Sequence, residues 1–295
     1  MPREVVVTGM PELPEVETVR RGLVRRVKNK RIKTVEVRKA SMVRGSAAAF
    51  VRQLTGDAFD RIERRGKLLI FHLAKADKYM LVHLKMTGQL ILESGKKTSG
   101  GGHPWPPVGD GLPNKYSHVI FSFASGAKLY FNDMRQFGYL QIVDEKKLAL
   151  ATAHYGVEPL SKDYTWEAFR ESMRGRSVSL KAALLNQTLV AGLGNIYADE
   201  VAYRARVRPS RRVPRVTEAE WRRIYREIPK VLAEALKYRG TTFDKFRDSE
   251  GKSGDFSSRL KAYGRAGLKC KRCGTIMVKT KVAQRGTTYC PNCQR

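Results

Sequence analysis

Residues 10–20 read Met-Pro-Glu-Leu-Pro-Glu-Val-Glu-Thr-Val-Arg, and this stretch governs the interpretation of the whole chain. Pro14 suits the first turn of a helix, because proline fixes φ and lacks an N–H that the first turn would leave unpaired. Apolar residues then recur at helical spacing, at Val16, Val19, Leu23 and Val27. The pattern predicts an amphipathic helix that anchors the segment around Pro11 to a core.

Pro11 carries a secondary amine only if it is the first residue, since a proline inside a chain has no nucleophile. A terminal amine near its pKa attacks a sugar carbon and forms an iminium, the chemistry of a Schiff base. We expect translation to start at Met10, because Arg3-Glu4-Val5 can be encoded by a stretch containing GGAGG, the pattern of a ribosome-binding site. Removal of Met10 would expose Pro11 with Glu12 beside it as an acid–base partner. The alternative is a genuine N-terminal arm.

The charge balance points to a polyanionic partner. Lys plus Arg number 57 against 28 Asp plus Glu, which gives a formal net charge of +29 and a pI of about 10.2. Such basicity serves a nucleic-acid binder through counterion release and salt-dependent search, although it does not separate DNA from RNA. No apolar run approaches the roughly 18 residues that span a bilayer, and no segment resembles a signal peptide. We therefore expect a cytoplasmic, nucleoid-associated protein with no membrane partner.

The hydrophobic pattern changes along the chain. From about Ile32 to Asp144, short runs of β-branched and aromatic residues predict the strands of a β-sandwich. The segment from Ser94 to Asn114 is rich in Gly, Pro and Lys, and we expect it to be a mobile loop. After the stretch Gly156–Leu160, the periodicity becomes helical to about Arg239.

Four cysteines lie within the last 26 residues, as Cys270-Lys-Arg-Cys273 and, after sixteen residues, Cys290-Pro-Asn-Cys293. Two Cys-x-x-Cys pairs at this separation supply four thiolates for one tetrahedral Zn²⁺, with room for a β-hairpin between them. A closed shell of four thiolates makes the zinc structural. Arg285 would project from the hairpin, where its planar fork suits a DNA phosphate.

A glycine turn between two predicted helices supplies a further anion site. Gly192 and Gly194 permit a tight turn, and Asn195 begins the second helix. The exposed amides of that helix, with the Asn195 side chain, would bind a DNA phosphate. Taken alone, a Gly-x-Gly turn is weak support for such a site.

These motifs together resemble the bacterial formamidopyrimidine-DNA glycosylases, which excise 8-oxoguanine and ring-opened purines and share a superfamily with endonuclease VIII. The resemblance runs from Pro11 to Arg295 and includes the Pro-Glu block, the helix-two-turn-helix and the zinc finger in the family's order. With the patterns above, it implies an α+β multidomain protein. The expected units are a removed or mis-assigned extension at 1–10, a catalytic β-sandwich domain with flanking helices at 11–145, a linker at 146–160, a helix-two-turn-helix DNA-binding domain with a lesion-capping loop at 161–264, and a zinc finger at 265–295.

The resemblance also implies the catalytic residues. Pro11 would be the nucleophile and Glu12 would handle protons at the sugar. Lys67 would reach the phosphate and sugar at the lesion, although a lysine at the start of an apolar strand is more often solvated. Arg285 would contact the phosphates that flank the lesion and assist strand cleavage.

Further residues would bind DNA by the same resemblance. An enzyme that flips a nucleotide must fill the gap and satisfy the orphaned partner base, which suits apolar wedges and an arginine donor. Without the resemblance, Met86 and Phe137 would be read equally well as core residues. Gln136 replaces an arginine common at that position, and Asp255 replaces an aromatic residue. The DNA-binding set comprises Met86, Arg135 and Phe137 in the void, Asn195 on phosphate, Tyr116 where a histidine is common, Arg176 as a basic contact, and Lys252 in the capping loop.

We therefore expect a monomeric DNA glycosylase and AP lyase with one structural Zn²⁺, acting on oxidised purines in damaged double-stranded DNA by β,δ-elimination. An endonuclease VIII-like enzyme for oxidised pyrimidines is the nearest alternative, but that branch usually has glycine where this chain has Leu13. If Pro11 stays blocked, the alternative is a non-catalytic binder of damaged or abasic DNA. A general RNA-binding zinc protein would share the charge and the cysteines but has no reason to carry the Pro-Glu block.

Overall fold

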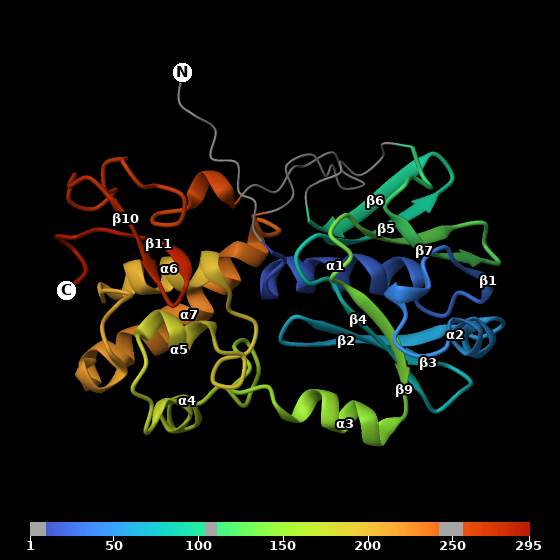
Figure 1. Ribbon diagram of the computed structural model, residues 1–295, viewed down its shortest axis with the longest axis horizontal. Helices are drawn as coiled ribbons and strands as arrows, with labels where there is room; N and C mark the ends of the chain where they lie inside the picture. Colours follow the sequence, from blue (N-terminus) through green and yellow to red (C-terminus); the bar gives the residue numbers. More distant parts are fainter. Residues whose placement is uncertain (1–9, 104–110, 242–255) are drawn as a thin grey trace.

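The structure is a computed structural model that describes residues 10–103, 111–241 and 256–295. It has a β lobe and a helical lobe, with α1 running from the junction into the β lobe (Figure 1). The α-helices are α1 Leu13–Val27, α2 Ala47–Leu54, α3 Glu145–Ala153, α4 Trp166–Met173, α5 Leu180–Leu185, α6 Asn195–Ala205 and α7 Glu218–Lys237. Short 3-10 helices are η1 Ala40–Met42, η2 Val213–Arg215 and η3 Ser257–Arg259.

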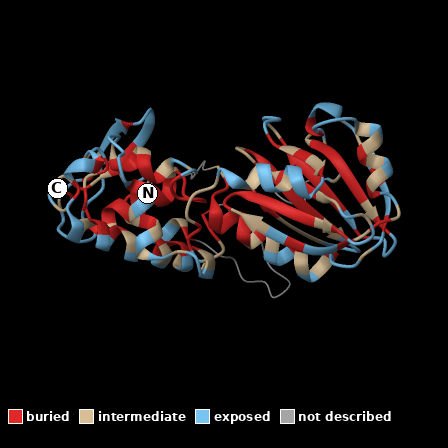
Figure 2. Ribbon diagram, turned by 90° about the horizontal axis from the view of Figure 1, so that it is seen from below, coloured by how far each residue is buried: buried red, intermediate tan, exposed pale blue. Residues whose placement is uncertain are grey.

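The β lobe is a sandwich of two antiparallel sheets, as the sequence predicted. One sheet has the strand order β1-β7-β8-β5-β6 and the other β2-β3-β4-β9. The strands are β1 Ile32–Val37, β2 Phe59–Arg65, β3 Leu68–Leu73, β4 Tyr79–His83, β5 Gly88–Ser94, β6 Lys97–Gly102, β7 Ser117–Phe123, β8 Lys128–Asp133 and β9 Tyr139–Val143. Their buried faces pack into one hydrophobic core, which Figure 2 shows as red bands.

Helix α1 contributes to both hydrophobic cores. Val16, Val19 and Leu23 pack in the sandwich core, whereas Leu13 belongs to the core of the helical lobe. The Leu13 N–H also donates to the carbonyl of Gly192 in the helical lobe, at 3.0 Å. The first residues of α1 are therefore fixed where the lobes meet.

One expectation about an irregular segment was wrong. The segment from Ser94 to Asn114 is not loop throughout, because Lys97–Gly102 form β6, paired with β5. Glycines at positions 100–102 obscured this strand. Gly102 is required there, since an added Cβ would collide with the backbone of Gly88 and Gln89 in β5, and a Cβ at Gly100 would make tight contacts of 3.0 Å with the same strand. The predicted linker at 146–160 contains most of α3, which Asp144 caps by accepting from the Lys147 N–H.

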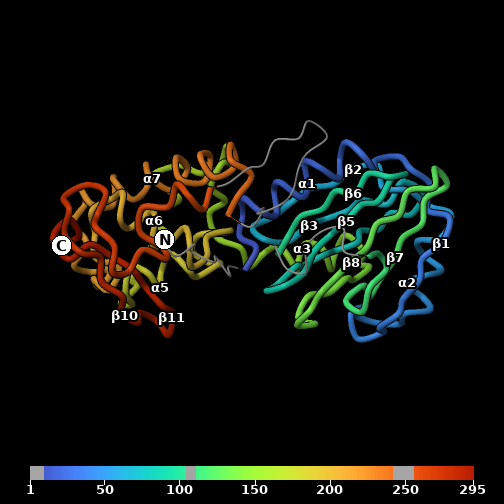
Figure 3. The backbone as a smooth tube through the Cα atoms, turned by 90° about the horizontal axis from the view of Figure 1, so that it is seen from above, coloured from blue at the N-terminus to red at the C-terminus, as the bar shows by residue number. Residues whose placement is uncertain are grey.

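The C-terminal segment folds as a hairpin of β10 Val278–Val282 and β11 Arg285–Tyr289. Ala283 and Gln284 between the strands both have positive φ, the conformation of a tight two-residue hairpin turn. In Figure 3 the hairpin lies on the helical lobe, at the opposite end of the molecule from β1. In the described parts of the chain, no helix has the length and apolarity needed to cross a membrane.

Candidate active site at the lobe junction

Glu12, a predicted catalytic residue, lies just before α1 and is almost completely buried. Its side chain is 1% exposed, and its carboxylate accepts from the first amides of α6. Gly194 N–H donates to Oε2 at 2.7 Å and Ile196 N–H to Oε1 at 2.9 Å, with a longer contact of 3.4 Å from Tyr197 N–H. The N-terminus of a helix favours an anion, and here the anion belongs to the chain itself.

This arrangement corrects the expectation that the α6 amides are exposed to a DNA phosphate. Glu12 occupies them, and no local pattern signalled this because the two segments lie 182 residues apart. Asn195 is half-buried, and its side chain lies beside that of Tyr263. Of the anion site inferred from the sequence, only the Asn195 side chain is left to meet phosphate.

Two glycines make the close approach of α1 and α6 possible. A Cβ at Gly194 would collide with Cδ of Glu12, and one at Gly192 would lie 2.5 Å from a methyl carbon of Leu13. Gly192 also has a φ of +88°, which L side chains rarely adopt. The Gly-x-Gly sequence therefore serves to seat Glu12 and Leu13.

Gly194→Ala should displace the Glu12 carboxylate, because the added methyl group cannot share its space. We expect a loss of roughly 1–3 kcal/mol of stability from overpacking and, for the base excision that the sequence predicts, a fall of about 100-fold or more in rate from misplacement. Thermal melting and single-turnover excision measure the two effects. Gly22→Ala is the matched control, because no atom lies within 4 Å of its added Cβ. Full activity of the Gly194→Ala variant would show that the position of the Glu12 carboxylate is unimportant for the reaction.

Glu15 joins the start of α1 to two other elements. Its Oε2 accepts from the Glu12 N–H at 3.0 Å, which completes a capping box. Its Oε1 accepts from the Tyr197 hydroxyl at 2.6 Å and from the Thr241 N–H at 2.8 Å. Glu15 was not singled out from the sequence, although a glutamate at the third position of a helix is the usual capping-box signal.

Lys67 lies in the turn before β3 and is only 5% exposed, so it is not a solvated strand end. Burial lowers the pKa of its ammonium group, while the charges of Glu12 and Glu15 raise it and that of Arg285 lowers it. Burial likewise raises the pKa of Glu12 to about 7, against the lowering effect of Lys67. The structure thus places Glu12, Lys67 and Arg285 within electrostatic reach of one another.

Lys67→Met should raise the pKa of Glu12 further, because Lys67 is the largest influence that lowers it. In the wild type, Glu12 should hold its proton below about pH 7 and lose it above. The pKa of Glu12 is raised in the folded protein, from 4.5 to about 7. Its contribution to stability should therefore fall as the pH rises from 4.5 through about 7. A carbon-13 NMR titration of labelled glutamate measures the pKa directly. An unchanged value in Lys67→Met would mean that the two groups are not coupled.

Pro11 is buried and directly precedes Glu12 at the start of α1. In the chain as described its nitrogen is in a peptide bond with Met10, so it has no free amine. Its position nevertheless places that nitrogen one residue from the Glu12 carboxylate.

The four cysteines meet at the base of the hairpin. Their Sγ atoms lie within 4.8 Å of one another. Four sulfurs at about 2.3 Å from a tetrahedral Zn²⁺ require separations of this size, so the set fits the metal. The Arg272 N–H donates to Sγ of Cys270 at 3.4 Å and the Cys293 N–H to Sγ of Cys290 at 3.3 Å, contacts that stabilise thiolates.

A buried ion pair fixes the hairpin to the helical lobe. Lys181 Nζ donates to Asp199 at 2.7 Å and to the carbonyl of Gly286 at 2.9 Å. Asp199 also accepts from the Thr288 N–H at 2.9 Å, and burial raises its pKa to about 6. These contacts hold β11 on α5 and α6, with the exposed Arg285 side chain beside the turn. Neither Lys181 nor Asp199 was singled out from the sequence.

Met86, Arg135 and Phe137 lie in neighbouring turns held together by Asp133. The Asp133 carboxylate accepts from the Thr87 hydroxyl and from the N–H of Gly138 at 2.6 Å. The Arg135 N–H donates to Thr87 Oγ1 at 2.9 Å. Phe137 is 52% exposed with the Arg135 guanidinium 4.8 Å from its ring centre, so the core interpretation of Phe137 is wrong. Met86 is half-buried.

The remaining predicted contacts are more scattered. Tyr116 is half-buried, and its carbonyl accepts from the Asp133 N–H at 3.1 Å, which places it beside the same turns. Arg176 is exposed between α4 and α5, and no contact joins it to the other predicted residues in the described ranges. Lys252 and Asp255 lie outside the described residues.

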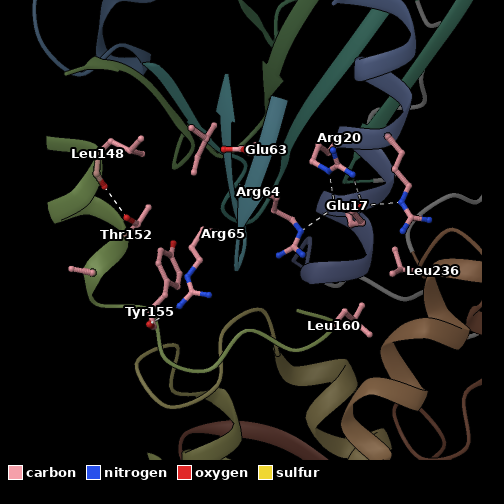
Figure 4. Close-up of a pocket in the computed structure, with 13 residues that line it drawn as sticks. Glu17, Arg20, Glu63, Arg64, Arg65, Leu148, Thr152, Tyr155, Leu160 and Leu236 are labelled. Carbon is pink, nitrogen blue, oxygen red and sulfur yellow. Dashed lines mark hydrogen bonds and ion pairs between the residues drawn. The ribbon is translucent and has the colours of Figure 1, made fainter. Parts of the chain in front are cut away.

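A cleft of about 800 Å³ lies apart from these residues, and of the predicted site residues in the described ranges none lines it. Figure 4 shows Arg64 between Glu17 of α1 on one side and the neighbouring side chains of Arg65 and Tyr155 on the other. Arg64 pairs with Glu17 at 3.2 Å and with Glu158 at 2.5 Å. This charged cluster therefore ties α1, β2 and the segment between the lobes.

Comparison with known proteins gives consistent matches along the chain. The family models described as formamidopyrimidine-DNA glycosylase N-terminal domain and H2TH domain match residues 10–140 and 155–247, and the zinc finger found in FPG and IleRS matches residues 267–295. The formamidopyrimidine-DNA glycosylase of Symbiobacterium thermophilum is 43% identical over 97% of this chain and 89% of its own length. The chain belongs to the formamidopyrimidine-DNA glycosylase family.

Solved structures of the family have the same fold. The Lactococcus lactis enzyme in complex with DNA containing an abasic site is 34% identical, with a TM-score of 0.85 over 96% of this chain and 99% of that one. Its complex with DNA containing N7-benzyl-Fapy-dG is 35% identical, with a TM-score of 0.84 over 97% of this chain and 100% of that one. The predicted α+β fold and the single structural zinc are confirmed. The predicted domain boundaries stay predictions.

Proposed function

We propose that this chain is a base-excision-repair DNA glycosylase and AP lyase that removes 8-oxoguanine and formamidopyrimidines from duplex DNA. The observation that carries the proposal is the buried Glu12 carboxylate, held by α6 amides beside Lys67 in a chain of this family. A carboxyl group that titrates near neutral pH is suited to transferring protons at a sugar. The relatives named formamidopyrimidine-DNA glycosylase support the choice of substrate.

We assign the nucleophile to the Pro11 amine of a mature chain that begins at Pro11. The amine attacks C1′ of the damaged nucleotide, and the glycosidic bond breaks with its electron pair leaving on the base. Glu12 exchanges protons with the sugar, so that the ring opens and the covalent product becomes an iminium. Lys67 contacts the phosphate and sugar and assists β and δ elimination, which leave a one-nucleotide gap. The match of the family model from residue 10 onward supports this start.

Two sets of residues recognise DNA: one opens the duplex at the damaged nucleotide, and the other binds the phosphate backbone. Phe137 and Met86 fill the space left by the extruded nucleotide, and Arg135 bonds to the unpaired partner base. The exposure of Phe137 supports a role as wedge. Phosphates are bound by Arg285 and Asn195, with further contacts from Tyr116, Arg176 and Lys252. The enzyme acts as a monomer in the cytoplasm, on nucleoid DNA; its charge of +29 favours that partner.

Side-by-side excision separates purine from pyrimidine specificity. The chain beginning at Pro11 should release 8-oxoguanine and formamidopyrimidine from duplexes faster than oxidised pyrimidines. Leu13 favours this outcome over endonuclease VIII-like activity, because the endonuclease VIII branch usually has glycine after the Pro-Glu pair; here Leu13 packs in the helical core against Gly192. Faster release of an oxidised pyrimidine such as thymine glycol would overturn the assignment.

A further inference from the structure

We propose that the β lobe carries a second surface for duplex DNA, remote from the lesion site. It consists of six cationic side chains at the C-terminal end of α1 and the start of β1. They are Arg25, Arg26, Lys28, Lys30, Arg31 and Lys33, and we call them the α1–β1 cluster. The inference rests on the proposed function only in assuming that a damaged duplex occupies the opposite end of α1.

The cluster has no neutralising partners of its own. Between Glu17 and Glu36 the chain contains no acidic residue. Arg20 and Arg21, which begin this basic run, both pair with Glu17 at 2.8 Å. In the described ranges, no carboxylate forms an ion pair with any of the six side chains that follow.

Asp57 is the acidic residue nearest the start of β1, but its carboxylate is buried and bonded to backbone N–H groups. The Asp57 carbonyl accepts from the Ile32 N–H at 2.7 Å, so Asp57 lies against the start of β1. Its buried carboxylate accepts from the N–H groups of Ala58 at 2.7 Å and Lys75 at 3.0 Å. The exposed Lys75 and Asp77 lie in the turn that donates to this carboxylate and carry opposite charges, whereas the exposed Asp60 nearby offsets one of the six positive charges. The surface therefore keeps a strong positive excess.

The cluster is exposed and far from the candidate active site. Four of its members are exposed and the other two, Arg26 and Lys30, are partly so. Helix α1 has 15 residues, so at 1.5 Å per residue the cluster lies about 22 Å from Glu12. Figures 1 and 3 both place β1 at the end of the molecule away from the helical lobe.

The chemistry of this surface fits the phosphates of duplex DNA. A duplex presents one negative charge per roughly 1.7 Å of its axis, and cations that meet it release counterions. Like charges packed this closely repel one another and weaken the fold, unless a polyanion neutralises them. Lysine on an edge strand also prevents edge-to-edge pairing, which accounts for Lys33 but not for the cations on α1. A protein that binds two duplexes at once could transfer from one DNA segment to another without dissociating fully from DNA.

The experiment measures whether a complex already holding one duplex binds a second. The protein is saturated with a short duplex that contains an abasic-site analogue, and a fluorescent undamaged duplex is then titrated and followed by anisotropy. The test variant combines Lys28→Gln, Lys30→Gln, Arg31→Gln and Lys33→Gln. The control variant removes four exposed cations on and near α3 and α4, namely Lys146→Gln, Lys147→Gln, Lys162→Gln and Arg174→Gln.

We expect the wild type and the control to bind the second duplex alike, and the test variant at least tenfold more weakly. The slope of second-duplex affinity against salt should flatten by roughly 0.9 for each phosphate that the variant no longer neutralises, while excision from the first duplex is unchanged. Thermal melting establishes that both variants fold.

Several outcomes would overturn the inference. The first is that the wild-type complex binds no second duplex. The second is that the test and control variants bind the second duplex equally weakly. The third is that the surface binds structured RNA in place of DNA. Weakened binding of the first duplex alone would also overturn it, because the cluster would then extend the lesion site. Failure of the wild type to bind the first duplex would instead contradict the proposed function.

Discussion

A chain that begins at Pro11 should form a borohydride-stable adduct with DNA containing an abasic site, and a chain that keeps residues 1–10 should form none. The difference is all or none, because a peptide-bonded proline nitrogen cannot form an iminium. The intact mass of the protein establishes which N-terminus is present. Denaturing gel electrophoresis after reduction measures the fraction of DNA in the covalent adduct. No adduct from a chain confirmed to start at Pro11 would refute the mechanism.

Lys67 provides the control for this experiment. It is a buried amine with a lowered pKa in the same site, and so is the first candidate for an alternative nucleophile. If the longer chain is trapped and its Lys67→Met variant is not, the nucleophile is Lys67. A Lys67→Met chain that begins at Pro11 should still form the adduct on abasic DNA, more slowly, because Pro11 keeps its amine.

Cys290→Ser should abolish zinc binding and, with it, tight binding of damaged duplex. Structural zinc contributes on the order of 10–16 kcal/mol to small zinc domains, far more than a short hairpin can supply by packing. Without it the strands that carry Arg285 and Gly286 lose their shape, so Lys181 also loses its acceptor. We expect about one zinc per wild-type chain by elemental analysis, and at least tenfold weaker DNA binding by the variant, about 1.4 kcal/mol.

Two further substitutions on the hairpin separate metal binding from DNA binding. Lys279→Gln, at an exposed position of β10, should keep both zinc and DNA affinity nearly unchanged. Arg285→Ala should keep the zinc but weaken binding, because only the side chain at the tip is removed. If the metal-free Cys290→Ser protein binds damaged DNA as tightly as the wild type, the finger takes no part in recognition.

Features set by local sequence could be predicted. The apolar spacing from Val16 to Val27 predicted α1, and the alternating runs from Ile32 onward predicted the sandwich. The two Cys-x-x-Cys pairs predicted the zinc hairpin, since ligand type and spacing are written directly in the chain. The glycines of β6 misled because they signal a turn locally, whereas here they allow close strand packing.

The interior of the site could not be predicted, because its contacts join distant segments. Glu12 meets the first amides of α6, Glu15 meets Thr241, and Lys181 meets Gly286. Nothing in the sequence around Gly194 shows that its missing side chain makes room for a carboxylate. The predicted roles of Pro11, Lys67 and Arg285 came from family resemblance, and the geometry adds the burial that shifts the pKa values of Glu12 and Lys67.

Because α1 is shared between the two hydrophobic cores, its first turn is sensitive to opening of either lobe. Leu13 unfolds with the helical core and Val16 with the sandwich core, yet less than one helical turn separates them. Local opening of either core must therefore fray the same turn, and Glu12 lies at its edge. In terms of cooperative unfolding units, the start of α1 belongs to both, so its protection against hydrogen exchange is limited by the weaker core. A substitution that weakens packing far away in either lobe would therefore lower the protection of the turn beside Glu12.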